Sequence, residues 1–262
     1  MNKTMLPFAK YSGNGNDFVI LDHPQVPVSP ELVQKLCNRH FGVGADGVLT
    51  VTEVDGFDGE MRIFNADGGE AEMCGNGLRC VATYLDDVGE VKKNTYRIKT
   101  MNNNYLVIRQ GNGFAIRMSE IKDQNLHDLS GFKEFQKSFF VNTGVPHLVF
   151  LGRNIKELDI KKVAAPYRFN PMFSGGTNVS FVEVLGTGNQ LAYVRTYERG
   201  VEDETFSCGT GLTATGLALA HWFGWNGSIQ LTTLGGKHTI EIGQNVLFSG
   251  EVTCCFKGEA SI

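Results

Sequence analysis

Two cysteines occupy the same local pattern in this sequence. Cys74 and Cys208 each stand directly before Gly-x-Gly, at the start of a segment with the apolar periodicity of a helix. A helix N-terminus presents unpaired N–H groups and a partial positive charge, so it lowers the pKa of a thiol there and can hold a carboxylate. Each pattern therefore predicts a reactive thiol beside an anion-binding helix end.

Both cysteines close a longer internal repeat. Residues 62–77 and 195–211 each run from an arginine, through a strand and an acidic turn that contains glycine, to Cys-Gly-x-Gly. The two arginine-to-cysteine spacings differ by one residue, which a loop can absorb. A weaker echo links residues 15–19 with residues 144–148. The repeat predicts that one architecture occurs twice in the chain.

Two opposed thiols suit one specific reaction, the inversion of a stereocentre. Inverting a stereocentre by proton transfer requires a base on one face of the carbon and an acid on the other, and the two groups exchange roles in the reverse direction. A thiolate and a thiol meet this requirement, while two helix ends aimed at an α-carboxylate stabilise the developing carbanion. Cys74 and Cys208 therefore predict an amino-acid epimerase that needs no cofactor such as pyridoxal phosphate.

The elements that must position these cysteines are mostly strands. Short runs rich in Val, Ile, Phe, Tyr and Thr, bounded by Gly and Asn, recur along the chain. Helical periodicity is rarer, and it predicts helices over residues 30–39, 76–88, 155–165 and 209–222. The fold class is therefore α+β, with a mainly antiparallel sheet around a central helix in each repeat.

The repeat also predicts the domain boundaries. We expect an N-terminal domain over residues 1–122 and a C-terminal domain over residues 123–249, because residues 119–127 are polar and unpatterned. Residues 250–262 are expected to return to the first domain as a C-terminal strand.

Composition excludes several classes of function. The net charge is −4 and no run of Lys or Arg is present, so nucleic acid is not an expected partner. The longest apolar segment, residues 212–225, is interrupted and shorter than the roughly 20 residues of a membrane span. We expect a cytoplasmic protein with no membrane partner, and a homodimer is left open.

The other cysteines are interpreted as structural. The chain has six cysteines but no C-x-x-C pair and no paired histidines at ligand spacing, so no zinc site is expected. Cys37 and Cys80 are predicted to be buried packing residues. Cys254 and Cys255 are expected in a strand, with one of them facing inward.

Two glycine-rich segments resemble nucleotide sites without their context. Residues 42–47 satisfy G-x-G-x-x-G, but they follow a predicted helix and enter a predicted strand, the reverse of a dinucleotide site. Residues 235–237 lack the spacing of a P-loop and are expected to form a hairpin turn.

Several sequence blocks, in order, are similar to the signatures of one known family. The blocks are Ser12-Gly-Asn-Gly-Asn-Asp-Phe18, Arg39-His-Phe-Gly-Val-Gly-Ala-Asp-Gly47, Arg62-Ile-Phe-Asn-Ala-Asp-Gly68, Met73-Cys-Gly-Asn-Gly-Leu-Arg-Cys80, Tyr197-Glu-Arg-Gly200 and Cys208-Gly-Thr-Gly211. Over essentially the whole chain the sequence resembles the diaminopimelate epimerases. The resemblance implies two similar α+β domains with the substrate in the cleft between them. It also implies interconversion of LL- and meso-diaminopimelate, in lysine and peptidoglycan synthesis.

The resemblance also assigns site residues. Cys74 and Cys208 match the acid/base pair, and His147 matches a histidine close to the catalytic centre. The positions that match substrate-binding residues are Asn16, Asn65, Gly75, Asn76, Asn178, Glu198, Arg199, Gly209 and Thr210. Asn14 is expected to be a turn residue instead.

Two positions depart from one common version of the family pattern. Gly47 stands where some members have a substrate-contacting glutamine, and Val145 replaces an asparagine that would help bind the distal carboxylate. Because valine cannot donate that hydrogen bond, an epimerase or racemase of another amino acid on the same scaffold is the alternative. An isomerase of the phenazine-synthesis type should lack one or both cysteines. A cysteine-dependent hydrolase or an amino-acid-binding protein would leave the duplicated thiol unexplained.

Overall fold

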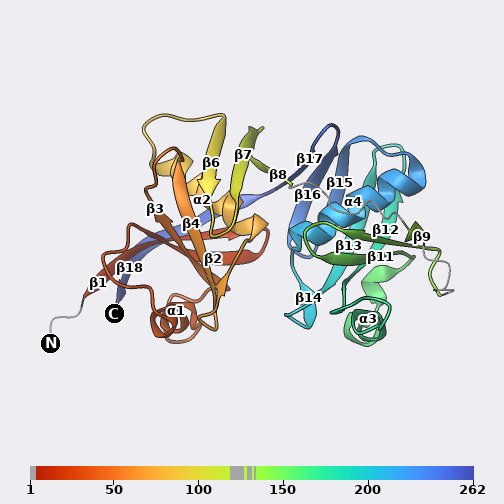
Figure 1. Cartoon of the computed structure of the whole chain (residues 1–262), viewed down its shortest axis with the longest axis horizontal. Helices are drawn as coiled ribbons and strands as arrows, with labels where there is room; N and C mark the ends of the chain where they lie inside the picture. The colour runs from red at the N-terminus through yellow and green to blue at the C-terminus, as the bar shows by residue number, and fades with distance from the viewer. Residues whose placement is uncertain (1–3, 119–126, 129–131, 133) are drawn as a thin grey trace. The chain divides into compact units, whose positions relative to one another are not determined.

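The chain forms two compact units, which are described separately. The computed structural model describes residues 4–118, 127–128, 132 and 134–262. Unit 1 comprises Met1–Ile116 and Ser249–Ile262, and unit 2 comprises Arg117–Phe248 (Figure 1). The boundary predicted at residues 122 and 123 lies outside the described residues.

Strands outnumber helices in both units. The elements of unit 1 are β1 (Met5–Gly13), β2 (Asn16–Asp22), α1 (Pro30–Cys37), β3 (Gly47–Thr52), β4 (Gly59–Asn65), β5 (Glu70–Ala71), α2 (Gly75–Val88), β6 (Thr95–Lys99), β7 (Asn104–Gln110), β8 (Gly113–Arg117) and β18 (Val252–Ser261). The elements that follow β8 are β9 (His127–Asp128), β10 (Lys137–Asn142), β11 (Pro146–Leu151), the 3-10 helix η1 (Ile155–Glu157), α3 (Ile160–Arg168), β12 (Asn178–Gly186), β13 (Leu191–Glu198), β14 (Asp203–Thr205), α4 (Gly209–Phe223), β15 (Gly227–Thr233), β16 (Gly236–Ile242) and β17 (Val246–Gly250). The predicted α+β class is confirmed.

The strand pairings of unit 1 recur in unit 2. In unit 1, β2 is parallel to β3, β3 is antiparallel to β4, and β4 is parallel to β6. In unit 2, β11 is parallel to β12, β12 is antiparallel to β13, and β13 is parallel to β15. Each parallel pair is joined by a helical crossover, as parallel strands require. The sequence repeat is therefore a repeat of topology.

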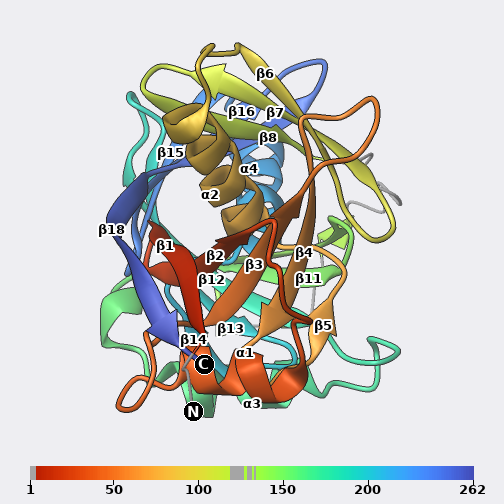
Figure 2. The same cartoon turned by 90° about the vertical axis from the view of Figure 1, so that its left-hand side faces the viewer.

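Each unit is built around one helix. In unit 1, α2 contacts β1, β2, β3, β4, β6, β7 and β18, and in both views strands lie around it (Figures 1 and 2). In unit 2, α4 contacts β10, β11, β12, β13 and β16. The α4 sequence is apolar on all sides, and its Thr213 and Thr215 hydroxyls donate to the carbonyls of Gly209 and Gly211. These bonds satisfy the hydroxyls inside the core.

Strand β1 contains a buried lysine. Apolar alternation is broken at Lys10, whose side chain is buried because it pairs with Asp17 at 2.7 Å. The ladder with β18 also shifts its register between Lys10 and Tyr11. Cys254 and Cys255 in β18 are both exposed, so the expectation that one faces inward is wrong.

The third predicted helix is divided in the structure. Residues 155–165 were expected to form one helix, but a 3-10 turn ends before Asp159 and α3 begins after it. The Asp159 carboxylate accepts the Lys162 N–H at 3.3 Å, so it caps a new helix instead of lying inside the old one.

Apolar side chains fill a separate core in each unit. Val19, Leu21, Val33, Leu36 and Val48 pack between α1 and the sheet of unit 1. The core under α3 in unit 2 is aromatic and contains Phe150, Tyr167, Phe173, Phe181 and Tyr193.

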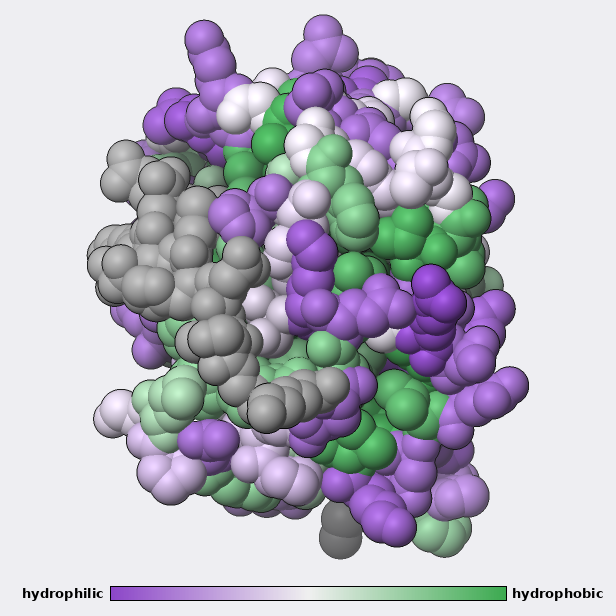
Figure 3. All heavy atoms as spheres, turned by 90° about the vertical axis from the view of Figure 1, so that its right-hand side faces the viewer, coloured by the Kyte–Doolittle hydropathy of each residue, from purple (hydrophilic) through white to green (hydrophobic). Residues whose placement is uncertain are grey.

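The surface in Figure 3 mixes hydrophilic and hydrophobic residues. Among the described residues, no helix is both long and apolar enough to cross a membrane.

Candidate functional site

In unit 1, Cys74 is the N-cap residue of α2. Its backbone is extended, with φ of −143°, and its sulfur accepts the Gly77 N–H at 3.4 Å. The side chain is partly exposed. A Cβ at Gly77 would lie 3.2 Å from the Leu49 side chain, so glycine lets the helix end pack closely against β3. The Gly-x-Gly motif therefore fixes Cys74 at the first turn of α2, as the sequence predicted.

Two asparagines lie beside Cys74. The Asn16 Oδ1 atom is 3.7 Å from the Cys74 sulfur and accepts the Asn76 Nδ2–H at 3.3 Å. Asn76 and Gly75 form the first turn of α2, and Asn16 begins β2. The structure thus brings together four of the predicted residues of unit 1. Asn65 is exposed at the end of β4, with no side-chain hydrogen bond among those described.

In unit 2, Cys208 is likewise the N-cap residue of α4, but it is buried. Its side chain has 6% exposure, and its sulfur lies 3.5 Å from the Thr210 hydroxyl. A Cβ at Gly211 would lie 3.2 Å from the hydroxyls of Ser180 and Thr196, so a glycine again admits the helix end to the sheet. A Cβ at Gly209 would lie 2.8 Å from the Phe248 ring, so glycine allows close packing at this position as well.

The pKa of Cys208 differs from the sequence expectation. Burial raises the pKa of the Cys208 thiol above its usual range, and the Glu198 carboxylate beside it raises that pKa further. Hydrogen bonds from Thr210 and the Gly211 N–H lower it by less. The prediction of a lowered thiol pKa is therefore wrong for Cys208, because desolvation outweighs the helix end.

Glu198 lies at the end of β13, against Cys208. Burial raises the pKa of the Glu198 carboxyl, although neighbouring side-chain hydrogen bonds partly offset the rise. A half-buried acid and a buried thiol in contact form one coupled titrating pair. Glu198 is thus a neighbour of the Cys208 thiol, a position that the sequence alone did not indicate.

Asn178 and Arg199 are joined through the backbone. The buried Asn178 side chain accepts the Arg199 N–H at 2.8 Å and donates to the Pro146 carbonyl at 2.9 Å. The guanidinium of Arg199 lies near the Gly175 carbonyl at 3.4 Å and is partly exposed. Asn178 therefore fixes the turn that carries Arg199.

His147 is fully buried in β11, opposite Asn178 in the parallel pair. Neither ring nitrogen has a hydrogen-bond partner among the described residues. Burial lowers the pKa of His147 to about 3, and the positive charge of Arg199 contributes. The imidazole is accordingly neutral at physiological pH.

The repeat relates site residues of the two units. Since Phe18 pairs with Gly47 in β2–β3 and His147 pairs with Asn178 in β11–β12, Phe18 corresponds to His147 and Gly47 to Asn178. The same registers make Val145 the counterpart of Asn16. The two cysteines are thus equivalent, whereas the residues around them differ.

Several contacts at the site involve residues that the sequence did not single out. The Thr143 hydroxyl donates to the Thr210 carbonyl at 3.0 Å. Arg168 binds Glu202 at 2.6 Å, and Glu202 accepts the Gly200 N–H beside Arg199. Asp46 and Arg79 hold Asn16 and Asn76, and both lie within the signature blocks. For Asp46 and Arg79, the position within those blocks was the only sequence evidence of a role at the site.

No cluster of three or more metal-binding side chains occurs among the described residues.

Solved structures share this fold over nearly the whole chain. A phenazine biosynthesis protein of the PhzF family from Enterococcus faecalis matches with a TM-score of 0.75 at 13% identity, covering 99% of this chain and 100% of that one. A probable proline racemase from Agrobacterium radiobacter K84 matches with a TM-score of 0.63 at 14% identity, covering 97% and 92%. At these identities the likeness shows the fold alone.

Sequence comparison defines the family. The sequence model of the family described as "Diaminopimelate epimerase" matches residues 8–120 and 139–252. Diaminopimelate epimerase from Flavobacterium psychrophilum is 35% identical over 247 residues, which is 92% of each chain. The enzyme from Methanocella arvoryzae is 36% identical over 278 residues, covering 99% of this chain and 98% of that one. The chain belongs to the diaminopimelate epimerase family, and the predicted resemblance is confirmed.

Proposed function

We propose that this protein interconverts LL- and meso-diaminopimelate by two-base proton transfer between Cys74 and Cys208. The observation that carries the proposal is the duplicated cysteine at the N-cap of the central helix in each unit. Membership of the epimerase family supports the substrate.

The mechanism assigns complementary starting states to the two thiols. Burial and Glu198 favour the protonated form of Cys208, so Cys208 starts as the acid. Cys74, partly exposed and bonded by the Gly77 N–H, is assigned as the base. The Cys74 thiolate removes the α-proton, and Cys208 delivers its proton to the opposite face, so one proton is taken up and one released. In reverse the roles exchange.

The helix ends supply the electrostatic part of catalysis. The N–H groups of Gly75 and Asn76, with those of Gly209 and Thr210, would bind the α-carboxylate as negative charge spreads from the α-carbon. The mechanism requires both thiols to reach opposite faces of one carbon. No step of the proposed mechanism uses a cofactor.

Specificity in this proposal comes from the second amino-acid end of the substrate. Arg199 offers a guanidinium that can bind a distal carboxylate, while Asn65 ends β4 and Asn178 begins β12. Val145 supplies no hydrogen bond there, so epimerisation of another amino acid is the alternative outcome of the test.

Single-cysteine variants test the mechanism. Cys74→Ala and Cys208→Ala should each lower epimerisation by ~10²–10⁴-fold or more, because each removes one of the two proton-transfer groups. Cys254→Ala removes an exposed thiol and serves as the control. The assay follows inversion of the α-carbon, from LL- to meso-diaminopimelate, with no cofactor added. Turnover near the wild-type rate in either catalytic variant would exclude the two-base mechanism.

A panel of amino acids tests the substrate. A site built to bind a distal carboxylate leaves buried polar groups unpaired when that carboxylate is missing, which can discriminate by ~10⁴-fold. Diaminopimelate should therefore react far faster than histidine, proline or alanine. A faster monocarboxylic substrate would leave the mechanism intact and overturn the diaminopimelate assignment.

Two further expectations concern the cellular compartment and the oligomeric state. A reducing cytoplasm keeps both reactive cysteines as thiols, so we propose that the enzyme works there. The expectation of a possible homodimer is tested by sedimentation equilibrium, which measures the molecular mass of the purified protein in solution.

A further inference from the structure

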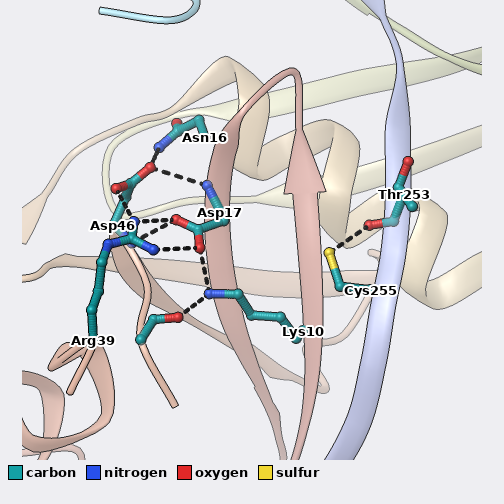
Figure 4. A network of polar contacts seen from close by, with 8 residues as sticks. Lys10, Asn16, Asp17, Arg39, Asp46, Thr253 and Cys255 are labelled. Atoms are coloured by element: carbon teal, nitrogen blue, oxygen red, sulfur yellow. Dashed lines mark hydrogen bonds and ion pairs between the residues drawn. The ribbon is translucent and has the colours of Figure 1, made fainter. Parts of the chain in front are cut away.

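Four charged side chains, two basic and two acidic, form a cluster beside Asn16 in unit 1. Arg39 donates to both carboxylate oxygens of Asp17, at 2.8 and 3.1 Å, and to Asp46 at 2.7 Å (Figure 4). Lys10, nearly buried, pairs with Asp17 at 2.7 Å and also donates to the Gly44 carbonyl. Burial raises the pKa of the Asp17 carboxyl, but Arg39 and Lys10 outweigh burial and hold that pKa well below its usual range. The Asp17 carboxylate is therefore ionised, and Arg39 ties it to Asp46.

This cluster determines which way the Asn16 amide points. Asp46 Oδ2 accepts the Asn16 Nδ2–H at 2.9 Å and the Asp17 backbone N–H at 3.1 Å. Asp46 Oδ1 accepts from Arg39 and Oδ2 already accepts a backbone N–H, so the amide end that faces Asp46 must be the NH2. The carbonyl oxygen of Asn16 must then point the other way, toward Cys74 and Asn76.

A buried arginine fixes the Asn76 amide in the opposite sense. Arg79 has 0% exposure and donates to Asn76 Oδ1 at 2.6 Å and to Asn14 Oδ1 at 3.0 Å. A guanidinium only donates, so the amide end that faces Arg79 must be the oxygen. The Nδ2 group of Asn76 therefore faces the site, where it meets Asn16 at 3.3 Å. Burial lowers the pKa of Arg79 only to about 10, which leaves it charged at neutral pH.

We propose that Asp46 and Arg79 are positioning residues that set the polarity of the amino-acid site in unit 1. Through them Asn16 presents a carbonyl acceptor suited to an ammonium group, and Asn76 presents an amide donor suited to a carboxylate. The proposal rests on the proposed epimerase function. It assigns roles to two residues that touch neither the reacting carbon nor its acid and base.

The repeat supports the pairing of each amide with its charged neighbour. In unit 2 the counterparts of Asn16 and Asn76 are Val145 and Thr210, which have no amide. By the same alignment, Asp46 and Arg79 become Thr177 and Thr213. Those two hydroxyls donate to the backbone carbonyls of Asn178 and Gly209 instead. Amide and charged neighbour are therefore present together in one unit and absent together in the other.

Double-mutant cycles test the inference on the full chain. Asp46→Ala should lower kcat/KM for diaminopimelate about tenfold, because Asn16 is then free to turn its amide. In an Asn16→Ala background, the same change should have no further effect. Arg79→Lys keeps the buried charge and should lower kcat/KM about tenfold, mainly by raising KM. In an Asn76→Ala background, Arg79→Lys should have no further effect on kcat/KM.

Asp58→Ala is the matched control. Asp58 also accepts a backbone N–H, from Arg97, and pairs with a cation, Lys93, but it contacts no site asparagine among the described residues. It should leave kcat/KM unchanged in every background. Additive losses in either cycle, or an equal loss in the control, would overturn the inference. Absence of α-hydrogen exchange by the wild-type chain would instead refute the proposed function.

Discussion

Glu198 shows how one neighbour can decide the state of a reactive group. The Cys208 thiol sits at a helix N-terminus, which favours the thiolate, yet burial and the adjacent carboxylate favour the thiol. A thiol kept protonated beside a carboxylate suits the acid of an acid–base pair. The side chains around Cys74 and Cys208 thus differ although the cysteines are equivalent in the repeat.

Replacing Glu198 with an isosteric neutral residue should lower the pKa of Cys208. Glu198→Gln removes the negative charge that opposes ionisation of the thiol, so Cys208 should be alkylated by iodoacetamide faster than in the wild type at the same pH. Quantitative peptide mapping between pH 7 and 9 measures the rate at that cysteine. Glu157→Gln, an exposed change in the same unit, should have no effect. Unchanged alkylation would contradict the role of Glu198.

His147 should make folding stability depend on pH. Its pKa is lowered from 6.5 to about 3 on folding, so between these values the unfolded chain binds one more proton than the folded chain. Its contribution is therefore complete above pH 6.5 and falls by about 1.4 kcal/mol per pH unit as the pH drops toward 3.

The comparison is with His147→Phe, since the repeat places a buried phenylalanine, Phe18, at the equivalent position. Urea unfolding at pH 5 and pH 8 should show a larger loss of stability at low pH for the wild type than for the variant. Equal losses would mean that His147 titrates normally.

At the level of elements, two arginine–glutamate pairs tie the repeated strands together. Arg62 in β4 binds Glu70 in β5 through two hydrogen bonds of 2.7 Å, and Arg195 in β13 binds Glu204 in β14 at 2.7 and 2.6 Å. Each pair fixes the short strand that leads into the helix bearing the reactive cysteine. The repeated arginines are therefore structural anchors.

The two anchors should differ in strength. Arg195 and Glu204 have 11% and 15% side-chain exposure, against 52% and 23% for Arg62 and Glu70. Glu204→Gln should cost about 3 kcal/mol of unfolding free energy, because it leaves a nearly buried guanidinium without its counter-ion. Glu70→Gln should cost at most about 1 kcal/mol. Chemical denaturation measures both, and equal costs would show that burial does not set the strength of the pair.

At the scale of the whole molecule, the proposed mechanism needs the two thiols at one substrate carbon. Oxidation should then join Cys74 and Cys208 in a disulfide, inactivate the enzyme, and be reversed by a thiol reductant. A Cys254→Ala/Cys255→Ala background removes the two exposed thiols that could pair instead. Peptide mapping of the oxidised protein identifies the bridge. A Cys74–Cys80 bridge, or full activity after oxidation, would speak against this mechanism.

Local patterns were enough to predict much of this protein. Gly-x-Gly after each cysteine specifies a helix start that tolerates close packing, and this depends on residues adjacent in sequence. The α+β class, the repeat, the family and the positions of Cys74 and Cys208 followed from such patterns. The burial of Lys10 in β1 did not, because it depends on Asp17 and on pairing with β18 at the other end of the chain.

Tertiary structure decided the electrostatics of the site. The pKa of Cys208 depends on how deeply α4 is buried and on Glu198 from another strand. The direction of the Asn16 amide depends on Asp46, 30 residues away in sequence. Both effects vary with distance and solvent exclusion, which no local sequence pattern encodes. Sequence thus determined which groups could react, and the packing of helices against strands decided their protonation and direction.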